Sequence, residues 1–290
     1  MKLLTFLYES QTRIGALVHL ELGEYIFDCT SVCGQEPGML ALLRLGQPGL
    51  EAVQAGLREA NSQPLIPRAE VTLLAPVPRP GKIICLGHNY FDHMGIGRTE
   101  PPAFPTFFGK FANTVIGPDQ PVLIPSVTRE VDYEAELAVV IGRTARQVSQ
   151  ADAYAYVAGY TIFNDVSARD YQKRTSQWMI GKNFDTFGPM GPVLVTREEI
   201  PDPHNLDLTL TLNKLEMQRT HTSHMIFSIP FLVATLSEVM TLEPGDVIST
   251  GTPAKTELAR QVEPGMKPGD VVSITIEPIG TLTNPIVARA

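Results

Sequence analysis

The sequence has little cysteine and little tryptophan for its length, with three cysteines and one tryptophan in 290 residues. A chain of this size needs no disulfides to form a core, and the odd number of cysteines favours free thiols in a reducing compartment, so we expect a cytoplasmic protein. Cys29 and Cys33 could form half of a zinc site, but no second cysteine or histidine pair follows at the required spacing. A structural zinc site is therefore not expected.

Long apolar runs and clusters of basic residues are also lacking. No stretch approaches the roughly 20 apolar residues that span a bilayer, and the first residues do not have the pattern of a signal peptide. The net charge of -8 comes from 31 acidic and 23 basic residues that are spread along the chain. Such a charge disfavours nucleic acid and anionic membranes, so we expect neither as a partner.

Signatures of nucleotide and zinc chemistry are missing as well. The absence of GxGxxG argues against a dinucleotide cofactor, and none of the six histidines forms an HExxH motif. STGTPA at 249–254 lacks the GK[ST] ending of a phosphate-binding loop. This turn instead offers Thr252 and backbone N–H groups as a cradle for a carboxylate or an oxyanion.

Two regions of the chain differ in their secondary-structure patterns. Residues 1–75 begin with alternating segments that predict short strands, followed by helical segments at 39–45 and 50–60. Proline-rich sequence then marks a connection, and short β-rich runs dominate residues 76–290, with helices expected at 149–156 and 229–240. We therefore predict an α+β, predominantly β protein with a small N-terminal α/β domain and a larger second domain.

Three carboxylates stand out as candidate metal ligands. In VDYEAELAVVIG, strand alternation would place Glu134 and Glu136 on one face, roughly 6.6 Å apart along the strand, close enough to share a cation. Asp165 ends a second apolar run, where a strand hands over to a loop. A lone ExE pair is more often the solvated face of an edge strand. Together, three carboxylates favour Mg²⁺, with Mn²⁺ and Ca²⁺ as alternatives.

Two further side chains are candidates for catalysis. His93 lies in a glycine-flanked loop directly after an expected strand at 82–87, where an imidazole would face a cleft, although a surface histidine is the plainer interpretation. Lys182 follows a glycine in MIGKNFDTFGPMGP and could hold its ammonium group beside a developing negative charge.

Seven segments, read in order, resemble the fumarylacetoacetate hydrolase family. The resemblance is to the branch with acylpyruvate hydrolases, oxaloacetate decarboxylases or tautomerases, and homoprotocatechuate-pathway isomerases and decarboxylases. The segments are GHNYFDH, VDYEAELAVVIG, AGYTIFNDVSARDYQ, QWMIGKNFDTFGPMGP, DPHNL, MIFSIP and LEPGDVISTGTP, within about residues 82–287. The resemblance implies a rolled, mixed β-sheet catalytic domain over residues 76–290, a homodimer, and Mg²⁺ bound by Glu134, Glu136 and Asp165.

The resemblance also implies roles for individual residues. Family members use the histidine that matches His93 to activate water, and the lysine that matches Lys182 lies near the metal. The residues that match contacts around the substrate are Tyr90, Lys110, Arg169, Gln172 and Thr252. One position departs from the pattern, because the family's hydrolases commonly carry a glutamate three residues after the histidine, where this chain has Ile96. Glu100 lies in the same loop.

Three functions compete on this sequence, and a small acidic dicarbonyl substrate is expected for the two enzymes. The leading hypothesis is hydrolysis of a carbon–carbon bond in a β-diketo or acylpyruvate acid, with water activated by His93 and the oxyanion stabilised by Lys182. The alternative is a metal-dependent keto–enol tautomerase, isomerase or decarboxylase of a 2-oxo diacid, which the apolar Ile96 favours because it would exclude water. The third, a non-catalytic binder, conflicts with the retained candidate residues.

Overall fold

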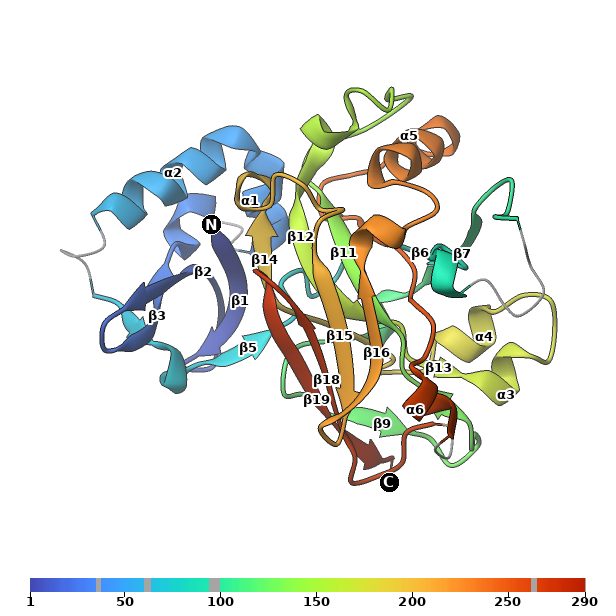
Figure 1. The fold of residues 1–290 in the computed structure, drawn as a ribbon. Coiled ribbons are helices and arrows are strands. Elements are labelled where there is room, and N and C mark those ends of the chain that lie inside the picture. The colour runs from blue at the N-terminus through green and yellow to red at the C-terminus, as the bar shows by residue number, and fades with distance from the viewer. Residues whose placement is uncertain (35–37, 60–63, 94–99, 262–264, 290) are drawn as a thin grey trace.

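The structure, a computed structural model, describes residues 1–34, 38–59, 64–93, 100–261 and 265–289. These residues form a twelve-stranded sheet, a five-stranded sheet and a two-stranded pair, with both parallel and antiparallel pairing in the two larger sheets. Figure 1 shows α1 and α2 beside the N-terminal strands, and the five-stranded sheet packed across β11 and β12. The predicted α+β, predominantly β architecture is confirmed.

The larger sheet runs through both regions of the chain. Its order is β4-β3-β2-β1-β14-β12-β11-β17-β6-β7, with β5 beside β1 and β8 beside β14. Because β1 pairs antiparallel with β14, the N-terminal strands and the second region share one sheet, and the division at residue 75 stays a prediction. The strands are β1 (Lys2–Tyr8), β2 (Gln11–Leu20), β3 (Gly23–Asp28), β4 (Ile66–Pro67), β5 (Thr72–Leu74), β6 (Ile83–Gly87), β7 (Thr106–Lys110), β8 (Val115–Ile116), β11 (Ala135–Ile141), β12 (Val157–Asn164), β14 (Gly188–Thr196) and β17 (Val247–Ser249).

The five-stranded sheet has the order β16-β15-β18-β19-β9, and β10 pairs with β13 on its own. Alternate residues of β15 and β18 are buried, as expected for strands with one face on the core. The strands are β9 (Val122–Ile124), β10 (Val131–Asp132), β13 (Ser167–Ala168), β15 (Asp207–Leu212), β16 (Leu215–His221), β18 (Val271–Ile276) and β19 (Gly280–Ala288).

The α-helices within the described residues are short. They are α1 (Met39–Leu45), α2 (Gln47–Arg58), α3 (Arg169–Gln172), α4 (Met179–Lys182), α5 (Ile229–Val239) and α6 (Glu257–Gln261). The helices expected at 39–45, 50–60 and 229–240 correspond to α1, α2 and α5. At 149–156 only Ala153–Tyr156 forms a helical turn, of the 3-10 type. The reason is local, because the Ser149 hydroxyl donates to the Asp152 carboxylate at 2.7 Å and accepts from the Asp152 N–H, closing a separate turn.

The central strands β11 and β12 are buried on both faces, which explains their continuous apolar sequences. On β11, Leu137 and Val139 belong to the core that includes β15 and β18, whereas Ala138 and Val140 belong to the core that includes α1 and α2. Close packing also requires Gly159 on β12, since an added Cβ would lie 2.1 Å from the Val195 carbonyl oxygen. These strands form the rigid frame of the site described below.

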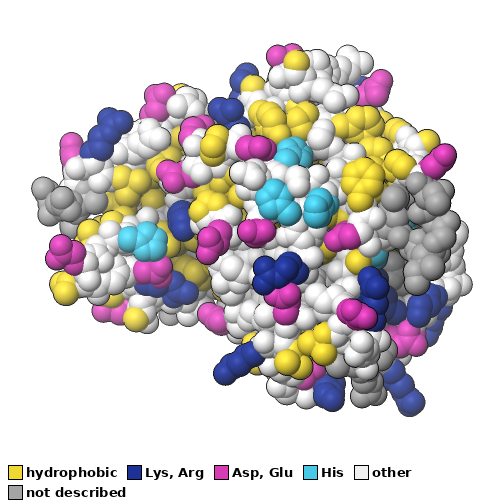
Figure 2. Space-filling view, in the orientation of Figure 1, with side chains coloured by type: hydrophobic (Ala, Val, Ile, Leu, Met, Phe, Trp, Pro, Cys, Tyr) yellow, Lys and Arg dark blue, Asp and Glu magenta, His cyan; other side chains and the backbone are white. Residues whose placement is uncertain are grey.

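No α-helix of the described residues combines the length and apolar character that a membrane crossing needs. On the face shown in Figure 2, acidic and basic side chains are interspersed, and several histidine side chains gather near its centre. The rings of His221 and His224, at the end of β16 and just beyond, lie 6.4 Å apart.

Candidate metal centre and cleft

The pairing of β11 with β12 brings three carboxylates together. Ala135, the first residue of β11, pairs with Asn164, the last residue of β12. Glu134, directly before β11, therefore lies beside Asp165, directly after β12. Asp165 N–H donates to the Glu134 carbonyl at 2.9 Å and locks this arrangement. The ligand atoms of Glu134, Glu136 and Asp165 all lie within 4.8 Å of one another. All three residues are buried, so they do not form the solvated face of an edge strand.

Three cationic side chains surround this carboxylate cluster, and two of them, Lys110 and Lys182, are buried. Lys182 Nζ donates to Glu134 Oε2 and to Asp165 Oδ2, both at 2.7 Å. Lys110 Nζ lies 2.8 Å from Asp165 Oδ1, and Arg169 lies 2.6 Å from Glu134 Oε1. Burial opposes the charge on Lys182, but the two carboxylates outweigh it and raise the pKa of Lys182 above its ordinary value. Lys182 is therefore a fixed positive charge and not a base.

Arg169 has the corresponding effect on Glu134. Burial alone would raise the pKa of this carboxyl group, but Arg169 and Lys182 together hold the pKa of Glu134 well below its usual range. Arg169 is itself oriented by Asp132, whose Oδ2 accepts from its Nε at 3.0 Å, and by Gln172, whose Oε1 accepts from Nη1 at 2.9 Å. Glu134 is thus an anion whether or not a metal is bound.

Glu136 is the carboxylate with an unused oxygen. Its Oε2 accepts hydrogen bonds from the Ser249 hydroxyl and from Gly251 N–H at 2.9 Å, whereas its buried Oε1 has no hydrogen-bond partner among the described residues. Burial, followed by the neighbouring Asp165 and Glu134, raises the pKa of Glu136 well above its usual range. A divalent cation would use the free oxygen and offset the repulsion, so the residues present fit Mg²⁺ or Mn²⁺.

A cleft of about 140 Å³ opens onto one side of the carboxylate cluster. Six residues named from the sequence line it, whereas Tyr90 and Lys110 are buried outside the lining and Glu136 and Asp165 lie deeper in the cluster. The six are His93, Glu134, Arg169, Gln172, Lys182 and Thr252. The structure therefore places acidic, basic and hydroxyl groups around one small volume, which suits a small anionic ligand.

His93 faces this cleft with its tautomer set by the main chain. Its Nδ1 lies 2.9 Å from the Thr252 carbonyl oxygen. Because a carbonyl can only accept, Nδ1 carries the proton, and Nε2 of the neutral ring is left as the basic nitrogen. Among the described residues, no carboxylate forms an ion pair with His93. Ile96 lies outside the described residues, and Glu100 is exposed.

Sequence reasoning missed a group of aromatic residues that line the cleft. His88, Phe108 and Trp178 line it, and the ring centroid of Trp178 lies 5.7 Å from that of His88 and 5.5 Å from that of Phe108. The signal for Trp178 was weak, because it lies in a polar segment with no periodic pattern. Its packing partner Gly87, at the end of β6, gave a clearer signal, since a glycine inside a strand pattern often marks a place where another group packs closely against the backbone.

Gly87→Ala is expected to displace Trp178. An added Cβ would lie 2.4 Å from Cζ3 of the indole, so the ring must move. Trp178 is the single tryptophan, so its fluorescence emission reports the change directly. Gly109→Ala on the neighbouring strand β7 is the matched control, because its nearest neighbour atom is 3.9 Å away. Identical emission spectra of the two variants would refute this packing.

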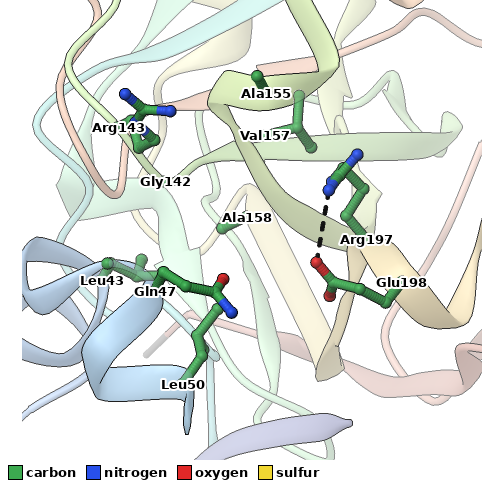
Figure 3. Close-up of a pocket in the computed structure, with 11 residues that line it drawn as sticks. Leu43, Gln47, Leu50, Gly142, Arg143, Ala155, Val157, Ala158, Arg197 and Glu198 are labelled. Atoms are coloured by element: carbon green, nitrogen blue, oxygen red, sulfur yellow. Dashed lines mark ion pairs between the residues drawn. The ribbon is translucent and has the colours of Figure 1, made fainter.

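A second cleft, of about 300 Å³, lies at the opposite ends of β11 and β12. Figure 3 shows Leu43, Gln47 and Leu50 of the α1–α2 region on one side, with Arg143 and Arg197 on the others. Arg197 pairs with Glu198 at 3.6 Å. Although this cleft is larger, it has no cluster of metal-ligating groups among its lining residues, so we place the functional site at the carboxylate cluster.

Comparison with known proteins agrees with this placement. Residues 82–287 match the family described as fumarylacetoacetate (FAA) hydrolase C-terminal. The chain belongs to the fumarylacetoacetate hydrolase family. An oxaloacetate tautomerase, mitochondrial, of Rattus norvegicus is 43% identical over 250 residues, which cover 86% of this chain and 79% of the relative. The resemblance inferred from the seven segments is therefore confirmed.

Two solved structures of fumarylacetoacetate hydrolase family members cover the whole chain. A maleylpyruvate hydrolase from Sphingobium sp. SYK-6, in complex with manganese(II) and pyruvate, is 33% identical with a TM-score of 0.82 and is matched over 100% of both chains. A 5-carboxymethyl-2-hydroxymuconate delta-isomerase from Mycobacterium smegmatis is 35% identical with a TM-score of 0.79 over the same full coverage. The family thus includes a hydrolase, an isomerase and a tautomerase among the relatives of this chain.

The expected cytoplasmic location is contradicted by the curated relatives. The tautomerases of Rattus norvegicus, Bos taurus and Homo sapiens that match this chain are mitochondrial proteins. The expectation rested on free cysteines, and Cys29, Cys33 and Cys85 are indeed unpaired. Free thiols indicate a reducing environment but do not distinguish one reducing compartment from another, which is why the inference went too far.

Proposed function

We propose that this protein is a metal-dependent tautomerase that interconverts the keto and enol forms of a small 2-oxo dicarboxylic acid. The observation that carries the proposal is the His93 ring, whose Nδ1 is hydrogen-bonded to a neutral carbonyl and whose Nε2 forms no hydrogen bond with another described residue. A carboxylate partner would help to stabilise an imidazolium during water activation, and none is present among the described residues. Proton transfer at an already acidic carbon demands less of the base.

The side chains around the cleft have matching roles in this reaction. Arg169 and Gln172 line the cleft, and in this reaction they bind a substrate carboxylate, because guanidinium and amide donors suit carboxylate oxygens. His93 Nε2 takes the proton from the carbon between the two carbonyl-bearing groups and returns it to the enolate oxygen. Lys182 stabilises the negative charge that develops on that oxygen. A bound divalent cation would supply Lewis acidity that favours the enolate.

Hydrolysis of an acylpyruvate is the second candidate function. The observation that favours it is the structural likeness to the maleylpyruvate hydrolase from Sphingobium sp. SYK-6. Hydrolysis would require the same metal centre together with a water molecule activated by His93. The two functions therefore differ in their products and not in their metal requirement.

The experiment that separates them incubates the purified protein with Mg²⁺ or Mn²⁺ and with oxaloacetate, acetylpyruvate or fumarylpyruvate. Enol absorbance is followed with and without chelator, and the products are identified by mass. We expect metal-dependent loss of the oxaloacetate enol without fragmentation, and we expect His93→Gln to abolish it while Mn²⁺ still binds. Two acid fragments from an acylpyruvate would establish the hydrolase instead, and release of CO₂ a decarboxylase.

A further inference from the structure

Gln218 is a buried amide that reaches the site from the second sheet. It lies on β16 and is 2% exposed. Its Oε1 accepts from Ala135 N–H at 3.0 Å, and Ala135 stands between the two glutamates of the carboxylate cluster. Its Nε2 donates to Thr252 Oγ1 at 3.0 Å and to the Pro253 carbonyl at 2.7 Å. One side chain thus joins the carboxylate strand to the 249–254 turn.

The chemistry of these contacts requires an amide at position 218. The Ala135 N–H can only donate and the Pro253 carbonyl can only accept, so the oxygen and the nitrogen of Gln218 are assigned without ambiguity. A glutamate carboxylate could accept the hydrogen bond from Ala135 N–H, but it has no hydrogen to donate to the Pro253 carbonyl. An apolar side chain would leave two buried backbone groups without a partner.

This bridge reaches both groups that Thr252 offers to the cleft. Because Gln218 donates to the Thr252 hydroxyl oxygen, the hydroxyl hydrogen stays available for an oxygen of a substrate. Because Gln218 also holds Pro253, it fixes the turn at the point where the Thr252 carbonyl accepts from His93 Nδ1. The side chain of Gln218 therefore acts on His93 through a main-chain carbonyl.

We propose that Gln218 is a positioning residue that couples the carboxylate cluster to His93 and maintains the tautomer in which Nε2 is basic. The expected effect of Gln218 on enol conversion rests on the proposed function, whereas its effect on the His93 tautomer does not. The turn has a second anchor, since Lys255 forms a backbone bridge with Gln218 and Thr256 N–H donates to the Met217 carbonyl at 2.8 Å. Replacement of the side chain alone is therefore expected to leave the fold intact.

The test compares Gln218→Met with Asn284→Leu. Asn284 is an equally buried amide, 1% exposed, that donates to the carbonyls of Gly117 and Gln120, neither of which lines the cleft. Both variants lose a buried amide, so both should lose thermal stability. Only Gln218→Met should lose kcat for enol conversion and affinity for Mn²⁺, each by about 10- to 100-fold, as is typical when an outer-shell partner is removed.

A nitrogen NMR measurement reads the tautomer without any substrate. The ring signals of His93 are assigned by their loss in His93→Gln, and the wild-type protein should show a protonated Nδ1, with Gln218→Met showing a mixture of tautomers. A wild-type ring protonated on Nε2 would overturn the proposal even if the variant did not fold. The proposal would also fail if Gln218→Met kept the wild-type tautomer of His93 and had the same Mn²⁺ affinity as Asn284→Leu. If the wild-type protein converts no oxo acid, the proposed function fails, and the tautomer and Mn²⁺ affinity still decide this inference.

Discussion

Glu136→Gln is expected to weaken metal binding strongly while the protein stays folded. The amide can still accept from Ser249 and Gly251 N–H, and it removes a buried carboxyl group whose pKa lies well above its usual range. The free energy of unfolding of the metal-free protein should therefore change by no more than about 1 kcal/mol. The affinity for Mn²⁺, measured by calorimetric titration, should fall by about 100-fold or more, since loss of a ligand exceeds loss of its supporting partner.

A buried carboxylate away from the cluster provides the matched control. Asp246 is 1% exposed and accepts from the backbone N–H groups of Lys82 and Glu243, at 2.8 and 2.7 Å. Asp246→Asn should therefore show the opposite pattern, with reduced stability and unchanged Mn²⁺ affinity. Wild-type Mn²⁺ affinity in Glu136→Gln would show that this carboxylate is not a ligand and would remove the central assumption about the site.

Lys182→Met is expected to give the largest loss of stability in the absence of metal. Lys182 is 2% exposed and lies 2.7 Å from both Glu134 and Asp165, so its removal leaves buried carboxylates with insufficient positive charge. Breaking a buried ion pair by removing one partner costs about 3–5 kcal/mol. A divalent cation replaces part of the missing charge, so saturating Mn²⁺ should stabilise the variant more than it stabilises the wild-type protein. Urea unfolding with and without Mn²⁺ measures both effects.

Lys82→Met serves as the control for this variant. Lys82 pairs with Asp246 at the same distance, 2.7 Å, but its side chain is 33% exposed, so its loss should cost less. Added Mn²⁺ should not restore the stability of Lys82→Met beyond its effect on the wild-type protein. Equal stabilisation of both lysine variants by Mn²⁺ would mean that Lys182 does not neutralise the metal-binding carboxylates.

The carboxylate cluster could be predicted from sequence because short-range patterns specify it. Glu134 and Glu136 flank the start of an apolar run, and Asp165 ends another, so both strands of an antiparallel pair carried the signal at the end where they meet. The prediction of one continuous strand face was less accurate. The strand pauses at residues 133 and 134, between β10 and β11, and Glu134 is placed by its hydrogen bonds with Asn164 and Asp165.

The surroundings of the cluster depend on tertiary packing that no local pattern encodes. Lys110 comes from β7 and Lys182 from α4, and only the resemblance to a family placed Lys110 near the pocket. The partner of His93 is harder still to predict, because a main-chain carbonyl leaves no trace in the residue type at position 252. The missing glutamate at Ile96 raised the tautomerase alternative but could not reveal which group orients the ring.

The sheet that pairs β1 with β14 links the stability of the N-terminal strands to that of the strands around the site. β14 lies between β1 and β12, so β12, the strand directly before Asp165, is separated from β1 by one strand. Local opening of β1–β3 would break the hydrogen bonds between β1 and β14. It would thereby destabilise β14, which pairs with β12 on its other side. A cation held at the carboxylate cluster should therefore slow amide hydrogen exchange in the N-terminal strands, although none of their residues belongs to the cluster.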